Sequence, residues 1–225
     1  MPSKKRLLNN FYRNMFRIIE KNRLFFTLYF ICFFIVFLNE FNKPMLDATL
    51  YFGEHRTAFG DGFFKFWTLW GEAYPYFLVA AFFFFYQKGK LNTQKTAVTG
   101  ISILIVTFLL KETFEYPRPA AVLDQMGYAS SFNFVDGIDI HTGPTSFPSG
   151  HTASAFALFG LLSFQFYKHK TLQVIFFFTA FLVGLSRVYL TQHFPQDTLF
   201  GSVVGLVIAM TVEYLFEKKP KEFSS

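Results

Sequence analysis

The sequence has little charge and almost no cysteine. Only 16% of its 225 residues are charged, and the single cysteine, Cys32, lies inside an apolar run. One thiol excludes an internal disulfide and any metal site built from several cysteines. The HExxH pattern and clustered carboxylates are missing as well. The sequence therefore implies no metal ion and no other cofactor.

Long apolar blocks are present instead. Hydrophobic residues make up 52% of the chain, and 36 of them are Phe. Soluble domains of this length usually carry more charge and fewer aromatic residues. Long blocks without amphipathic spacing indicate an integral membrane protein. The net charge of +6 could suggest nucleic-acid binding. However, the basic residues flank apolar runs as membrane topology requires, so no nucleic-acid partner is expected.

Six candidate spans predict an all-α fold, a polytopic bundle of six transmembrane helices. The start of the second is interrupted by Glu72 and Pro75. A short interfacial helix is expected around Phe63–Trp70, where aromatic residues cluster. The six apolar cores are Leu24–Leu38, Ala73–Tyr86, Thr96–Leu110, Thr152–Tyr167, Leu172–Tyr189 and Thr198–Phe216.

The whole chain, residues 1–225, is expected to be one membrane domain. It comprises a basic lead (1–23), two outer loops (39–72 and 111–150) and a tail (217–225). With six spans, both chain ends lie on the same side. Fifteen of the 21 Lys and Arg residues lie in the lead, the tail and the short connections on that side. The positive-inside tendency places both termini in the cytoplasm of a multi-pass cell (inner) membrane protein.

Polar residues gather where four of the spans reach the outer, extracytoplasmic side. Three of them, Lys111, Arg118 and Arg187, are cations that would hold a phosphate dianion if they faced one point. Ser149 and Gly150 lie at the start of the fourth span, where free N–H groups and the positive end of the helix dipole favour phosphate oxygens.

Two histidines complete this set. His193 precedes Asp197 by four residues, and a carboxylate near one ring nitrogen would leave the other free to attack phosphorus. His151 could protonate the departing oxygen as a general acid. Taken singly, Lys111 and Arg187 could be snorkelling side chains and Asp197 a helix cap. The combination favours one phosphate site.

The residues fall into three motifs, and with them the chain resembles the type 2 phosphatidic acid phosphatases. This family comprises membrane lipid phosphatases related to vanadium haloperoxidases. The motifs are KETFEYPRP (Lys111 to Pro119), PSGH (Pro148 to His151) and SRVYLTQHFPQD (Ser186 to Asp197). The resemblance implies a phosphohistidine intermediate on His193, oriented by Asp197, with His151 as the acid. It implies phosphate binding by Lys111, Arg118, Ser149, Gly150 and Arg187.

The partner that the resemblance implies is a membrane lipid with a terminal phosphate. The candidate substrates are phosphatidic acid, phosphatidylglycerophosphate, undecaprenyl (isoprenyl) diphosphate and lipid A phosphates. A lipid phosphotransferase with the same site remains an alternative. A non-catalytic lipid-binding or transport protein is an alternative of another class. A haloperoxidase is disfavoured, because those relatives are soluble.

Overall fold

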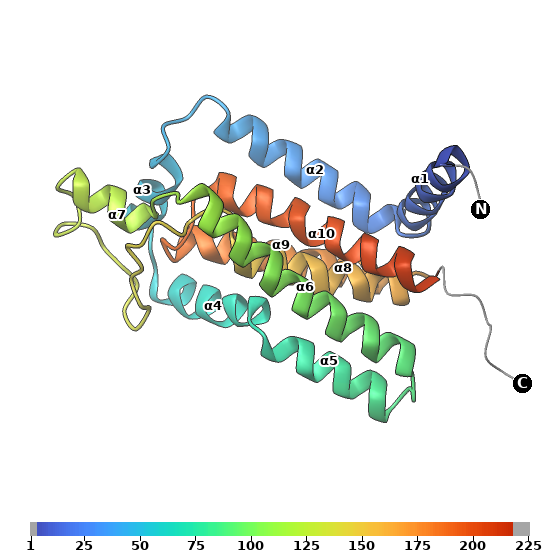
Figure 1. Ribbon diagram of the computed structural model, residues 1–225. Coiled ribbons are helices and arrows are strands. Elements are labelled where there is room, and N and C mark those ends of the chain that lie inside the picture. The colour runs from blue at the N-terminus through green and yellow to red at the C-terminus, as the bar shows by residue number, and fades with distance from the viewer. Residues whose placement is uncertain (1–3, 218–225) are drawn as a thin grey trace, which may run out of the picture.

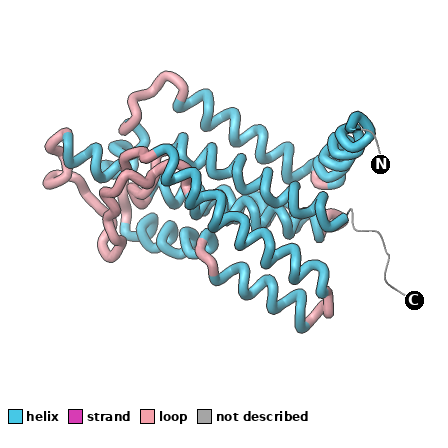
Figure 2. Tube along the Cα trace, viewed as in Figure 1, coloured by secondary structure: helices cyan, strands magenta, loops and turns pink. Residues whose placement is uncertain are grey.

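The computed structural model describes residues 4–217, and over that range the chain is helical and contains no strand (Figures 1 and 2). Its helices are α1 (Lys4–Lys21), α2 (Arg23–Glu40), α3 (Asp47–Glu54), α4 (Ala58–Thr68), the 3-10 turn η1 (Leu69–Gly71), α5 (Tyr74–Phe85), α6 (Lys90–Phe114), α7 (Pro119–Gln125), α8 (Gly150–Gln165), α9 (Lys170–Tyr189) and α10 (Pro195–Glu217).

All six predicted apolar segments are helices, namely α2, α5, α6, α8, α9 and α10. The all-α membrane fold is thereby confirmed. Four of them, α2, α6, α9 and α10, lie in segments long and apolar enough to cross a bilayer. The other two are shorter, with 12 residues in α5 and 16 in α8. The count of six crossings stays a prediction.

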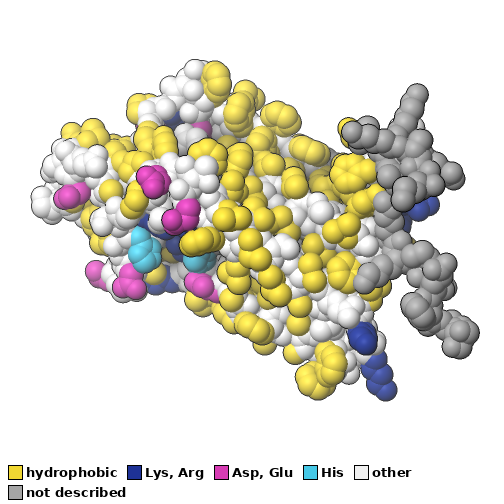
Figure 3. Space-filling view, viewed as in Figure 1, with side chains coloured by type: hydrophobic (Ala, Val, Ile, Leu, Met, Phe, Trp, Pro, Cys, Tyr) yellow, Lys and Arg dark blue, Asp and Glu magenta, His cyan; other side chains and the backbone are white. Residues whose placement is uncertain are grey.

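Helix α8 lies at the centre of the bundle. Every residue from Thr152 to Phe164 is buried, as is typical of a helix that is hydrophobic on all sides. It packs against α9, α10 and α6. Helices α2, α5 and α6 lie around it and carry many exposed Phe, Leu and Ile side chains. Figure 3 shows these apolar side chains along the length of the molecule, where a bilayer would cover them.

Two glycines let α10 approach α8 closely. A Cβ added at Gly201 would lie 2.6 Å from the backbone oxygen of Ser149, and one at Gly205 would collide with the carbonyl of Ala153. Small residues spaced by four allow such backbone contact between membrane helices. The contact fixes the start of α10 against the start of α8.

The ends of four helices meet at one end of the bundle, which we call the site end. Helices α6 and α9 finish there, and α8 and α10 begin there, beside α3 and α7 (Figure 1). Helix α1 and the last residue of α10, Glu217, lie at the opposite end.

Two segments are more ordered than the sequence indicated. The basic lead contains the helix α1, whose residues Met15, Ile18 and Ile19 pack against the core. The interfacial helix expected around Phe63–Trp70 is present as α4 and η1, although it begins earlier, at Ala58. Its helical nature is confirmed, and its position in an interface stays a prediction.

Candidate active site

The first motif is presented by the end of α6 and the start of α7. Glu115 adopts a left-handed conformation (φ 41°) and ends α6, while its N–H donates to the carbonyl of Lys111. A Cβ added at Gly150 would lie 3.9 Å from Nζ of Lys111, so this ammonium group lies beside the first turn of α8. Arg118 precedes α7 in extended backbone, and Pro119 is the first helical residue.

Arg118 and Arg187 are both buried, and one residue connects them. Arg118 donates to the backbone oxygen of Gln192 at 3.0 Å, and Arg187 approaches Oε1 of the same residue at 3.4 Å. Arg187 also donates to Oγ1 of Thr68 at 2.6 Å. In the described part of the chain, the buried Nε of each arginine has no hydrogen-bond partner. Each guanidinium therefore keeps a donor free for an anion.

The second motif forms the start of α8, as predicted. Ser149 is the N-cap, and its Oγ accepts from the N–H of Thr152 at 3.4 Å. The N–H of Ser149 donates to the backbone oxygen of Asp197 at 3.1 Å, which ties α8 to α10. The first N–H groups of a helix have no intrahelical acceptors. The start of α8 thus offers further donors beside Lys111.

His193 lies in the turn between α9 and α10 and is 1% exposed. Its Nδ1 is 3.4 Å from Oδ2 of Asp197. The same carboxylate oxygen accepts from the Ser146 hydroxyl at 2.5 Å and from the N–H of Phe194 at 3.0 Å. Ser146 Oγ is also 3.5 Å from Nδ1 of His193. The carboxylate is therefore held by two donors close to Nδ1 of the imidazole.

Burial lowers the pKa of His193 well below 6.5. The next causes, in order, are Arg187, Arg118 and Lys111, followed by His151. These groups come from all three motifs, and all of them act on one ring. The imidazole of His193 is consequently neutral near pH 7, which is the form that can attack phosphorus.

His151 lies in the first turn of α8 and faces a carboxylate. Its Nε2 is 2.7 Å from Oε1 of Glu72, the residue that follows η1. Figure 3 shows histidine side chains among basic and acidic ones at the site end, next to the apolar flank. The structure thus brings the predicted cations and both histidines to one end of the bundle.

Sequence reasoning missed four residues of this cluster. In the sequence, Ser146 lies in a polar loop and Thr68 among aromatic residues, and no pattern distinguishes either of them. Gln192 carried one weak signal, its position directly before His193. Glu72 was noticed only as an interruption of an apolar segment. Each of them comes near the site through tertiary packing.

The remaining histidines divide between the two ends. His169 lies in the connection between α8 and α9, at the opposite end. His55 closes α3, and its ring bonds to the backbone oxygen of Tyr51. His141 lies in the loop before α8, where slight burial, Arg118 and Arg187 lower its pKa. Arg118 and Arg187 therefore lower the pKa of both His141 and His193.

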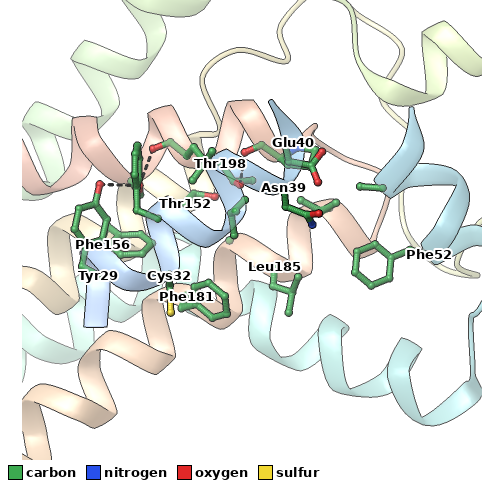
Figure 4. Close-up of a pocket in the computed structure, with 18 of the residues that line it drawn as sticks. Tyr29, Cys32, Asn39, Glu40, Phe52, Thr152, Phe156, Phe181, Leu185 and Thr198 are labelled. Carbon is green, nitrogen blue, oxygen red and sulfur yellow. Dashed lines mark hydrogen bonds between the residues drawn. The ribbon is translucent and has the colours of Figure 1, made fainter. Parts of the chain in front are cut away.

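A separate cavity of about 380 Å³ lies beside α2, α9 and α10 (Figure 4). Its wall is largely apolar and includes Phe156, Phe181 and Leu185, while Asn39 and Glu40 contribute polar atoms. None of the three cations and neither His151 nor His193 lines it. This cavity is distinct from the cation cluster.

The polar atoms that converge at the site end are mainly donors. Within residues 4–217, no three His, Cys, Asp or Glu side chains are grouped as metal ligands would be. Two arginines, a lysine and a helix start instead suit an anion with several oxygens, such as phosphate. A buried neutral imidazole is a side chain that can attack such an anion.

Over residues 4–217, the fold and this cluster define a helical membrane protein whose site end is rich in hydrogen-bond donors. The chain belongs to the PAP2 superfamily, which it matches over residues 94–221, more than half of its length. That range contains every residue of the three motifs.

Known relatives and a solved structure agree with this membership. The chain is 29% identical over 136 residues to Undecaprenyl-diphosphatase BcrC of Bacillus subtilis, covering 60% of this chain and 64% of the relative. It is 31% identical over 154 residues to Phosphatidylglycerophosphatase B of Bacillus subtilis, covering 65% and 68%. The crystal structure of a transmembrane PAP2-type phosphatidylglycerolphosphate phosphatase from Bacillus subtilis shares the fold. Its TM-score is 0.63 at 24% identity, covering 86% of this chain and 96% of that one. The match to the first relative spans slightly less than two thirds of its length.

Proposed function

We propose that this protein is an integral membrane lipid phosphatase. It hydrolyses the terminal phosphate of an amphiphilic lipid through a phosphohistidine on His193, without a metal ion. The observation that carries the proposal is the Gln192 bridge. Gln192 bonds Arg118 through its backbone and contacts Arg187 through its side chain, and it directly precedes His193. This bridge supports a nucleophile that lies close to both arginines.

In the first step, the free Nε2 of His193 attacks phosphorus and forms a P–N bond. The bond from phosphorus to the lipid oxygen breaks, and His151 gives that oxygen a proton. Asp197 orients the attacking ring through Nδ1. Lys111, Arg118 and Arg187 stabilise the negative charge on the three other phosphate oxygens, together with Ser149 and Gly150 at the start of α8.

In the second step, water attacks the phosphohistidine. His151 takes a proton from that water, the P–N bond breaks, and inorganic phosphate leaves. The same cations stabilise both transition states, because the phosphoryl group stays between them. The first step needs an imidazole that is free to attack, and both steps need a second one that exchanges protons. The cluster contains one of each.

The substrate is proposed to be a phospholipid-type phosphate such as phosphatidic acid, phosphatidylglycerophosphate or a lipid A phosphate. The relatives are named for two classes, a phosphatidylglycerophosphatase and an undecaprenyl-diphosphatase. An isoprenyl diphosphate is therefore the second candidate substrate. A lipid acceptor in place of water would make the protein a phosphotransferase.

The membrane arrangement is part of the same proposal. We place residues 1–225 in one domain with six crossings, in the inner membrane, with both termini in the cytoplasm. The site end then lies on the extracytoplasmic side, at the level of the lipid headgroups. The distribution of Lys and Arg supports this orientation.

A panel assay of the purified protein tests the proposal. We expect phosphate release from at least one lipid phosphate in EDTA, inhibition by orthovanadate, and no release by His193→Ala. The matched control is His169→Ala, a histidine at the opposite end, which should retain activity. Release by His193→Ala, or loss of wild-type activity in EDTA, would contradict the proposed chemistry.

A further inference from the structure

Glu72 is held beside His151 by the local backbone. It follows the 3-10 turn η1 and precedes α5, with extended backbone (ψ −179°). The residue before it, Gly71, packs directly on α8. A Cβ added there would lie 2.9 Å from the Cβ of His151 and 2.8 Å from Val183. Only a glycine permits this approach without movement of its neighbours, so the position of Glu72 is determined by packing.

The contact itself is short and specific. Oε1 of Glu72 lies 2.7 Å from Nε2 of His151. Within the described residues, neither side chain makes another hydrogen bond that competes with it. The hydrogen bond from His151 lowers the pKa of Glu72, so the carboxylate is ionised near neutral pH. Nε2 of His151 is therefore engaged with Glu72, and Nδ1 stays available for another hydrogen bond.

The other groups around His151 are cationic or neutral. Lys111 of α6, Arg187 of α9 and His193 of the α9–α10 turn face it, and Glu72 is the carboxylate among its charged neighbours. Cations near an imidazole disfavour its protonated form, and a carboxylate favours it. A general acid must hold a proton when the substrate binds. Burial and Arg187 lower the pKa of His151, and Glu72 raises it through its hydrogen bond and its charge.

We propose that Glu72 is a positioning residue for leaving-group protonation. Its carboxylate opposes the effect of the cations on His151 and holds Nε2–H, which leaves Nδ1–H to be donated to the lipid oxygen. As the bond from phosphorus to that oxygen breaks, the proton moves from Nδ1, and the ring becomes neutral. In the second step, Nδ1 accepts a proton from the attacking water. The inference rests on the proposed function and adds a residue outside the three motifs.

A purely structural role for this pair is a poor alternative. The side chain of Glu72 is 49% exposed and that of His151 is 27% exposed. Ion pairs this exposed contribute little to stability, because water and salt screen them. Removing the charge of Glu72 should therefore change the chemistry more than the folding.

The experiment compares Glu72→Gln with wild type on two amphiphiles of equal chain length. One is an alkyl phosphate, whose leaving oxygen needs a proton, and the other is a nitrophenyl phosphate, whose leaving group does not. We expect Glu72→Gln to lower kcat on the alkyl phosphate by about 10- to 100-fold, part of what a general acid contributes. The nitrophenyl phosphate should lose less than about threefold. The basic limb of the rate–pH curve for the alkyl phosphate should move to lower pH.

Three further variants keep the test decisive. Glu54→Gln, an exposed acid at the end of α3, is the matched control and should behave as wild type. Glu72→Asp keeps the charge and should keep the basic limb in place. In a His151→Gln background, Glu72→Gln should have no further effect on the alkyl phosphate. This double variant gives a result even where the single one folds poorly.

Equal losses on both substrates with an unchanged pH curve would overturn the inference, as would a fully active Glu72→Gln. An additive loss in the His151→Gln background would overturn it as well. A failure of the proposed function would give a different result. His193→Ala would then still hydrolyse the nitrophenyl phosphate. With His193→Ala inactive and Glu72→Gln normal, only the inference on Glu72 is lost.

Discussion

The two central histidines occupy opposite kinds of surroundings. His193 is buried next to Arg118 and Arg187, and its carboxylate partner Asp197 is already held by Ser146 and Phe194. His151 is partly exposed and faces Glu72. Two titratable groups with such different environments are suited to different roles. The buried ring is suited to attack and the paired ring to proton donation.

The protonation of His193 can be measured directly. Because burial and the cations lower its pKa, the protonated form should be reached only well below pH 6.5. An NMR titration of protein labelled at its histidine nitrogens would follow this ring, with His193→Gln used to assign the signal. We expect the signal to keep its neutral form as the pH falls through 6.5. Titration at or above 6.5 would contradict the electrostatics described here.

The motif residues could be predicted from the sequence because charged, histidine and serine side chains stand at fixed spacing within each motif. Lys111, His151 and His193 all lie at the helix ends that the apolar blocks predict. The contacts made by Ser146 and Gln192 could not be predicted. Each depends on how the loop before α8 folds over the cluster, and a loop of Gly, Pro, Ser and Asp has no period that fixes its path.

The helices are held together by different contacts at their two ends. At the site end, Gly201 and Gly205 bring α10 onto α8. Toward the opposite end, Lys95 of α6 and Glu213 of α10 form a buried ion pair at 2.8 Å. Both residues lie close to the ends of apolar blocks in the sequence, where nothing indicates a partner for either. Their pairing follows from packing of helices that are far apart in the chain.

Removing one partner of this ion pair should lower the unfolding free energy more than replacing both partners with apolar residues. Lys95→Met leaves Glu213 buried without a partner, which should cost about 3–5 kcal/mol of unfolding free energy. The double variant Lys95→Met/Glu213→Leu should recover most of that loss. Denaturant titration in detergent would measure both.

An exposed pair provides the comparison. Lys43 and Asp47 lie 3.2 Å apart with both side chains at least 40% exposed. Lys43→Met should therefore change the unfolding free energy by only about 0–1 kcal/mol. If Lys95→Met were no less stable than Lys43→Met, the buried pair would contribute nothing measurable to the unfolding free energy.

The molecule as a whole has an apolar flank and two different ends. The flank carries exposed Phe, Leu and Ile on the peripheral helices, and the polar cluster lies at the site end (Figures 1 and 3). This arrangement would bring a lipid phosphate to the cations while its hydrocarbon chains stay in the bilayer. The six helices were predictable from their apolar blocks, and so were the short lengths of α5 and α8.

The proposed orientation can be tested with single cysteines. Cys32 would be replaced by serine, and Asn133→Cys (site end) or Lys168→Cys (opposite end) introduced, both at exposed positions. A membrane-impermeant maleimide should label Asn133→Cys on intact cells and Lys168→Cys only after permeabilisation, because basic connections stay inside. The reverse pattern would place the site in the cytoplasm.

The proposed covalent step on His193 is open to one direct measurement. Wild-type protein would be mixed with a lipid carrying a labelled terminal phosphate, quenched in alkali within milliseconds, digested and examined by mass spectrometry. We expect a phosphate that is stable in alkali and lost in acid, on the peptide containing His193. Turnover with no such adduct, or an adduct on another residue, would contradict the account.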